Sequence, residues 1–295
     1  MAQRIEILVT LNEAYLPPLQ VMLVSLFENN PHQSFRIWLI HRQIPAEKLT
    51  ALAQLVHSLG GQLKPIQVDG QHWTGAPTEA RYPIEMYFRL LCADILPKTV
   101  KRVLYLDPDI LVVNPVQQLW QTELDGKMLA AATHSGMTHL VTGINNIRLG
   151  TDHGYYNSGV MLIDLAQARK IIKYADIERI INEHSDLLLL PDQDILNFLY
   201  GEEIKEIPEE NWNYDARKYP LYFTRSLGKH DLQWTLVNTA VLHFCGHPKP
   251  WEAHHDNRFT ALYLNYQQLT ARRLQALAPA SEEPPAESTA TSDSR

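Results

Sequence analysis

The sequence predicts an α/β protein whose central, mostly parallel β-sheet carries helices on both faces. Apolar runs typical of strands alternate with segments of helical periodicity over residues 1–70, and this order requires crossover helices between parallel strands. The 295 residues are 45% hydrophobic and 20% charged, a balance typical of a globular protein with a large core. Ligands of such sheets bind beyond the carboxyl ends of the strands, so polar residues that follow strands are candidates for a site.

Turn and capping residues bound the first helices. Pro17 is favoured in the first turn of a helix, and apolar residues at helical spacing follow it. A second helix is predicted over residues 45–59, ending at Gly60. Strands are predicted at 5–9, 35–40, 63–68, 102–106, 110–113, 129–132 and 159–163, all in one sheet, with further helices at 85–95, 166–183, 192–200 and 258–277.

Residues 1–277 show no repeat and no break in composition, so one domain is expected there. Residues 278–295 form a tail of Ala, Pro, Ser, Thr and acidic residues with no aromatic side chain. Such a tail cannot bury enough apolar surface to order itself, and we expect it to be disordered. Its acidic charge would repel an anionic membrane, so membrane contact is expected to be peripheral at most.

Charge and cysteine content exclude several classes of protein. The net charge of −7 provides no general attraction for nucleic acid, and no nucleic-acid partner is expected. Cys92 and Cys245 are too few for a disulfide framework, and no signal peptide or apolar run of about 20 residues is found, so a cytoplasmic location is expected. Gly-rich dinucleotide, Walker A and nucleophile-elbow motifs are missing, which removes support for dehydrogenases, P-loop NTPases and α/β-hydrolases.

The strongest local signal is Asp107-Pro108-Asp109, which directly follows a predicted apolar strand. Hard divalent ions such as Mn²⁺ and Mg²⁺ prefer carboxylate oxygens, and an ion held there could bridge the oxygens of a diphosphate. The alternative is an acidic turn, because Asp-Pro is ordinary turn chemistry. The apolar strands on both sides favour the metal site.

A second signal lies between His243 and Lys249. His243 could supply an imidazole, Gly246 a close backbone approach and Lys249 a phosphate contact. His243 could instead be a core residue, or it could join Cys245 and His247 in a zinc site. The Gly and Pro of this segment oppose the helix that would bring those three side chains together.

Two further motifs place polar groups beside predicted elements. Residues 157–159, Asn-Ser-Gly, precede a core strand, and Asp192, Gln193 and Asp194 begin a helix. Capping alone could explain Asp192. Gln193 has no evident capping role, so it is the position expected to face a ligand.

Taken in this order, the motifs resemble glycosyltransferase family 8, from about Ile5 to Trp251. The pieces that carry the resemblance are the opening strand with Asn12 and Tyr15, Tyr-Phe-Arg-Leu at 87–90, Leu-Tyr-Leu-Asp-Pro-Asp at 104–109, Tyr-Asn-Ser-Gly-Val at 156–160, Asp-Gln-Asp at 192–194 and His-Phe-Cys-Gly-His-Pro-Lys-Pro-Trp at 243–251. The resemblance implies a GT-A fold, that is, a single Rossmann-like nucleotide-sugar-binding domain with a mixed central sheet and helices on both faces. It also implies a UDP-sugar donor, Mn²⁺ and transfer with retention of anomeric configuration.

The resemblance assigns roles to the matching positions, which fall into four groups: metal ligands Asp107, Asp109 and His243; uridine contacts Thr10, Asn12 and Tyr15; diphosphate contacts Gly246 and Lys249; and the donor-sugar pocket Arg89, Asn157, Asp192 and Gln193. Gln193 and Asp192 are the implied catalytic residues, with Gln193 stabilising the cation-like sugar in a front-side displacement. Elementary electrostatics agrees with one part of this assignment, since a dication and Lys249 would stabilise the charge that develops on the leaving diphosphate.

We therefore predict a retaining, Mn²⁺-dependent hexosyltransferase, with Mg²⁺ as the alternative ion. The expected donor is UDP-glucose or UDP-galactose, and the expected acceptor is a glycan or a lipid-linked saccharide of the cell envelope. His134 stands where an acid is expected in the family's galactosyltransferases. The alternatives are a metal-dependent nucleotidyltransferase and a sugar-nucleotide-binding protein without turnover.

Overall fold

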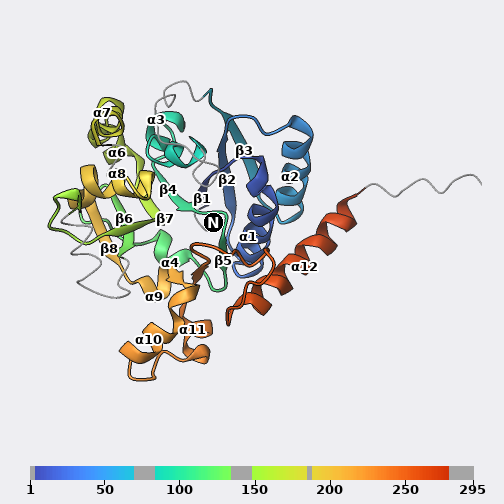
Figure 1. Ribbon diagram of the computed structural model, residues 1–295. Coiled ribbons are helices and arrows are strands. Elements are labelled where there is room, and N and C mark those ends of the chain that lie inside the picture. The colour runs from blue at the N-terminus through green and yellow to red at the C-terminus, as the bar shows by residue number, and fades with distance from the viewer. Residues whose placement is uncertain (1–3, 70–83, 134–147, 185–187, 279–295) are drawn as a thin grey trace, which may run out of the picture.

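The predicted α/β class is confirmed by a computed structural model that describes residues 4–69, 84–133, 148–184 and 188–278 (Figure 1). Its main sheet has seven strands in the order β3-β2-β1-β4-β7-β6-β8. Every neighbouring pair is parallel except the two pairs that β7 makes with β4 and β6. One reversed strand makes the sheet mixed, as the family resemblance implied.

The strands of the main sheet are β1 (Ile5–Thr10), β2 (Phe35–His41), β3 (Gln62–Gln67), β4 (Arg102–Leu106), β6 (Leu129–Thr133), β7 (Tyr156–Asp164) and β8 (Ile204–Ile207). Six were predicted to within a few residues. β7 begins three residues earlier than predicted, and β8 was missed because its four residues carry no clear alternation.

A second, three-stranded sheet has the order β5-β10-β9, from β5 (Ile110–Val112), β10 (Val241–His243) and β9 (Tyr214–Asp215). The prediction that residues 110–113 continue the main sheet was wrong. β5 instead pairs antiparallel with β10, and this pairing brings His243 opposite Ile110, next to the Asp107–Asp109 turn. The second sheet thereby joins segments about 130 residues apart in the sequence.

Eleven α-helices occur in the described ranges: α1 (Leu16–Glu28), α2 (Ala46–Ser58), α3 (Cys92–Ile95), α4 (Gln117–Trp120), α6 (Leu165–Ile171), α7 (Tyr174–His184), α8 (Pro191–Tyr200), α9 (Glu209–Trp212), α10 (Tyr219–Arg225), α11 (Leu232–Asn238) and α12 (Thr260–Leu277). Short 3₁₀ helices are η1 (Glu13–Tyr15), η3 (Ile84–Arg89), η5 (Gly201–Glu203) and η6 (Ala216–Lys218).

Two predicted helices are each split in two by the structure. Residues 85–95 form η3 and then α3, and residues 166–183 form α6 and α7 with an extended Ile172 between them. Ile172 is buried, so the apolar periodicity runs through the break and gives no warning of it. None of the described helices is long and apolar enough to cross a membrane.

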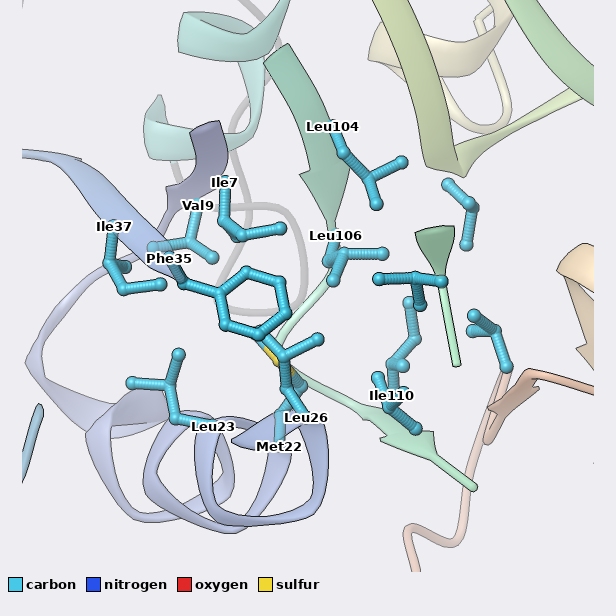
Figure 2. Packing of buried hydrophobic residues seen from close by; sticks show 14 of the residues in the cluster. Ile7, Val9, Met22, Leu23, Leu26, Phe35, Ile37, Leu104, Leu106 and Ile110 are labelled. Atoms are coloured by element: carbon cyan, nitrogen blue, oxygen red, sulfur yellow. The ribbon is translucent and has the colours of Figure 1, made fainter. Parts of the chain in front are cut away.

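The core lies on both faces of the main sheet because strand side chains alternate. Ile7 and Leu106 face one cluster, under α1 and α2, whereas Leu8 and Tyr105 face the other, under α3, α6, α7 and α8. Figure 2 shows the side chains of Met22, Leu23 and Leu26 of α1 facing the strand residues of this first cluster. With both faces covered, a ligand can approach the sheet only from an edge or from the strand ends.

Residues 134–147 and 279–295, which include His134 and nearly all of the predicted tail, lie outside the described residues.

Candidate functional site

A cavity of about 340 Å³ lies at the carboxyl ends of β1 and β4 and at the amino end of β7. Because β7 runs antiparallel to β4, its first residues reach the same edge of the sheet as the residues that follow β4. The predicted site residues that line the cavity are Thr10, Asn12, Tyr15, Arg89, Asp107, Asp109, Asn157, Asp192, Gln193, His243 and Gly246. Lys249, the remaining one, contacts Asp109 from the side.

Three donor atoms converge at the centre of this cavity. Oxygens of Asp107 and Asp109 and a nitrogen of His243 lie within 4.8 Å of one another, the one group of this kind in the described part of the chain. His243 Nε2 is 3.2 Å from Asp109 Oδ1, and its Nδ1 donates to Asn213 Oδ1 at 2.8 Å. A proton fixed on Nδ1 leaves Nε2 free to coordinate in the neutral ring, which is how metal-ligating histidines are oriented. The residues present therefore fit a hard divalent ion.

Lys249 neutralises the innermost carboxylate. Its Nζ donates to Asp109 Oδ2 and to the carbonyl of Phe244. Burial would raise the pKa of Asp109, but the positive charges and hydrogen bonds of Lys249 and His243 together outweigh this and lower the pKa far below its usual value. Asp109 is therefore a buried, charged carboxylate rather than the solvated turn acid that the sequence left open.

Arg89 bridges two carboxylates across the cavity. Its Nη1 lies 2.9 Å from Asp107 Oδ1, and its Nε lies 3.2 Å from Asp192 Oδ2. The guanidinium packs on the ring of Tyr105, whose hydroxyl donates to Asp107 at 2.6 Å. Burial raises the pKa of Asp192, and the charge of Arg89 acts against that rise. This network fixes the two acids relative to each other.

Asp192 does not cap α8, so the capping alternative is wrong. The N-cap position is Leu190, without a side-chain cap, and Asp192 Oδ2 accepts from Ser158 Oγ at 3.1 Å. Asp194 holds the start of the helix instead: it is fully buried and accepts from the backbone N–H groups of Leu189 and Leu190 at 2.7 and 2.9 Å. With the loop anchored in this way, Asp192 and Gln193 face the cavity.

Gln193 is held by one end of its amide. Its Oε1 accepts from Asn157 Nδ2 at 3.0 Å and from the Ser158 backbone N–H at 3.2 Å. Its Nε2 is buried and makes no hydrogen bond within the described part of the chain. A buried donor without a partner is costly, so this group is well placed to meet a ligand in the cavity.

Glycine is required at position 159 because β7 passes very close to His243 and Asp107. A Cβ at this position would lie 2.3 Å from His243 Cε1 and 2.8 Å from Asp107 Oδ2. Only glycine lets β7 come so close to these two side chains. His243 belongs to β10 of the second sheet, so the local sequence does not reveal this approach.

Two lining residues, Glu85 and Arg217, were missed from the sequence, and so was Asn213, which orients His243. Ser158 and Cys245 also line the cavity; both belong to motifs singled out from the sequence, but neither was among the predicted site residues. Asn213 and Arg217 flank the two-residue strand β9, which is too short for a periodic signal. The zinc alternative is not assembled, because the described metal-type cluster does not include Cys245 or His247, and His247 pairs with Glu252.

The fold is of the GT-A type, which solved glycosyltransferases share. A galactosyltransferase, LgtC, solved with donor and acceptor sugar analogues, has a TM-score of 0.76 at 24% identity over 90% of this chain and 96% of that one. The glycosyltransferase GlyE of Streptococcus pneumoniae TIGR4 has a TM-score of 0.67 at 20% identity over 93% of this chain and 63% of that one. The predicted GT-A architecture is confirmed.

Residues 6–255 match Glycosyl transferase family 8, and the chain belongs to this family. General stress protein A of Bacillus subtilis is 28% identical over 88% of this chain and 91% of its own length. Lipopolysaccharide 1,2-glucosyltransferase of Escherichia coli is 25% identical over 82% of this chain and 71% of its own. The family resemblance drawn from the motifs is thus confirmed over nearly the whole described chain.

Proposed function

We propose that this protein is a retaining, metal-dependent hexosyltransferase that moves glucose or galactose from a UDP-sugar to a glycan acceptor. The observation that carries the proposal is the Asp107, Asp109 and His243 cluster, which shares one cavity with the half-bonded amide of Gln193. Family membership and the glucosyltransferase relative support hexosyl transfer.

Each part of the cavity suits one part of such a donor. Thr10, Asn12 and Tyr15 at the end of β1 would hold the nucleoside, with the Tyr15 ring against the base. Asp107, Asp109 and His243 would hold Mn²⁺, with Mg²⁺ as the alternative, and the ion would neutralise charge on the diphosphate. Arg89, Asn157, Asp192 and Gln193 would surround the hexose.

The chain's own residues would favour departure of the diphosphate. The buried ammonium of Lys249 lies beside Asp109. There it would favour the negative charge that grows on the diphosphate as the sugar–phosphate bond breaks. The Gln193 amide is fixed at Oε1 by Asn157 and Ser158, so its Nε2 is the group that would donate a hydrogen bond to an oxygen of the donor, without reorganisation of the side chain.

The decisive experiment is a UDP-release assay over a panel of UDP-sugars with and without Mn²⁺, together with NMR of the product's anomeric configuration. We expect metal-dependent release with UDP-glucose or UDP-galactose and a retained anomer. Consumption of a nucleoside triphosphate and a sugar phosphate, with release of pyrophosphate, would identify a nucleotidyltransferase. UDP binding without consumption of any donor would identify a binding protein without turnover.

A further inference from the structure

Arg217 stands at the rim of the cavity and has no part in the proposed handling of the donor. It follows β9 in the 3₁₀ helix η6, and its side chain is 52% exposed. It lines the cavity together with Cys245 and Gly246, on the wall supplied by the second sheet. An exposed arginine in the lining of this cavity is a candidate for contact with a molecule that enters from solvent.

A buried acid holds this arginine in one orientation. Arg217 Nε and Nη2 donate to the two oxygens of Asp215 at 3.0 and 2.8 Å, and the Arg217 backbone N–H donates to Asp215 Oδ1 at 3.1 Å. Asp215 is fully buried, so its carboxylate cannot follow a moving side chain. One edge of the guanidinium is therefore occupied by Asp215, which leaves two N–H donors on Nη1 and one on Nη2.

Nη1 lies over the backbone of Gly246. A Cβ at Gly246 would be 2.4 Å from Nη1 and 3.3 Å from Cζ of Arg217, so the absence of a side chain there admits the guanidinium. Nη1 makes no hydrogen bond to any residue in the described ranges. A preorganised guanidinium with free N–H donors at a cavity is suited to a carboxylate or phosphate oxygen.

The donor diphosphate already has its own counter-charges deeper in the site. Lys249 is buried against Asp109, at the metal-type cluster, whereas Arg217 is half exposed at the solvent side. Once a donor fills the inner cavity, an acceptor would approach from the solvent side, and Arg217 is the exposed cation of the described lining on that side.

We infer that Arg217 selects an acceptor that carries an anionic group, a phosphate or a carboxylate, close to the hydroxyl that receives the sugar. The inference rests on the proposed hexosyl transfer and deepens it by naming the chemical class of the acceptor. Since the other edge of the guanidinium is neutralised by Asp215, Nη1 provides directed hydrogen bonds rather than a diffuse field.

The test measures binding of small probes to the full chain by NMR titration, in the presence of saturating UDP and Mn²⁺. The probes are glucose, glucose 6-phosphate and glucuronate. We expect the wild type to bind both anionic probes at least tenfold more tightly than glucose. Arg217→Met should remove this preference and leave UDP affinity within twofold.

Two further variants keep the result interpretable. Because Arg217→Met leaves Asp215 without its main partner, Arg217→Lys serves as the second variant. The lysine ammonium can still neutralise Asp215, but it has no second set of N–H donors for an acceptor anion. The anion preference of Arg217→Lys should therefore also fall about tenfold. Arg225→Met is the matched control, because Arg225 is a comparably exposed arginine that pairs with Glu210 outside this cavity. It should bind all probes as the wild type does.

Three outcomes would count against the inference. Equal binding of glucose and the anionic probes to the wild type would refute it, and so would a preference that persists in both Arg217 variants. A loss of UDP affinity in both variants as large as the loss of probe binding would assign Arg217 to the diphosphate instead. Absence of UDP binding to the wild type would refute the proposed function itself, which is a separate result.

Discussion

At the scale of single residues, the site is built from charged side chains that hold one another in place. Arg89 spans Asp107 and Asp192, and Lys249 is bound to Asp109. Buried charges paired in this way have fixed positions, and preorganisation of this kind is what electrostatic catalysis needs. Removal of one member leaves the other uncompensated, so substitutions here must be tested for stability as well as for activity.

Gln193→Ala is expected to lower turnover by about 10- to 1000-fold at saturating donor, with UDP affinity largely retained. The reason is that the substitution removes an amide that would act on the sugar and not on the nucleotide. Initial rates and UDP affinity are the measurements. Gln118→Ala, on an exposed turn of α4, is the control. A Gln193→Ala rate within about twofold of wild type, only about 0.4 kcal/mol of barrier, would return Gln193 to a structural role.

Asp109→Asn is expected to abolish the Mn²⁺-dependent part of UDP binding, because an amide is a poor ligand for a hard dication in place of a carboxylate. Asp109 is buried and paired with Lys249, so we also expect a loss of about 3–5 kcal/mol in stability. This loss of stability is larger than we would expect for a hydrated acid in a turn, the alternative interpretation of Asp109.

The double variant Asp109→Asn/Lys249→Met removes the stranded charge and should recover part of that stability without recovering metal dependence. Calorimetry with UDP in the presence and absence of Mn²⁺ gives the affinity, and thermal melting gives the stability. Wild-type UDP affinity in Mn²⁺ for the single variant would disprove the metal assignment.

At the scale of elements, the site depends on how closely β7 approaches the second sheet. Gly159→Ala would place a methyl group 2.3 Å from His243 Cε1. Since His243 and Asp107 must move, we expect Mn²⁺-dependent UDP binding to weaken at least tenfold. Gly126→Ala is the control, because its positive φ also strains an alanine, but the space around it is open and remote from the site. If both variants bind UDP equally well, the close approach has no functional role.

We expect the stability of the fold to depend on pH through His41, the last residue of β2. His41 Nδ1 accepts from the Ile44 backbone N–H at 3.2 Å, which requires a neutral ring, and burial lowers the pKa of His41 below its usual 6.5. The unfolded chain therefore binds this proton more tightly than the folded one, so the stabilisation is present above pH 6.5 and is lost as the pH falls through the folded-state pKa.

Urea unfolding at several pH values tests this expectation. Between pH 7.5 and pH 5.5 the wild type should lose more stability than His41→Gln, whose side chain retains an acceptor and does not titrate. An identical pH dependence for the two proteins would show that His41 does not contribute.

At the scale of the whole molecule, α12 lies beside α1 in Figure 1 and buries Tyr263 against Phe244. We propose, from composition alone, that residues 279–295 contribute to neither folding nor turnover. A chain that ends at Ala278 should keep its melting temperature and its rate of UDP release. A chain that ends at Phe259 should melt at a clearly lower temperature, because it loses the buried Tyr263. A large loss of activity in the chain that ends at Ala278 would reveal a role for the tail.

The local sequence determined the order of the longer strands and helices, the Asp107–Asp109 turn and the position of Gln193, but not the short strands β8, β9 and β10. Each of these depends on neighbouring residues, either through periodicity or through a motif at the end of a strand. Some of the twelve candidate residues were found for that reason, whereas Thr10, Asn12, Tyr15 and Arg89 came only from the family resemblance; eleven of the twelve line one cavity.

Tertiary structure alone decided which segments meet. The pairing of β5 with β10, the reversal of β7 and the neighbours of Gly159, Asp192 and Arg217 depend on contacts between residues far apart in the chain. Local propensity carries no information about such contacts, since they arise from the packing of complete elements. The sequence therefore determined which residues could form a site, and packing decided how they are arranged and which further residues, such as Arg217, share it.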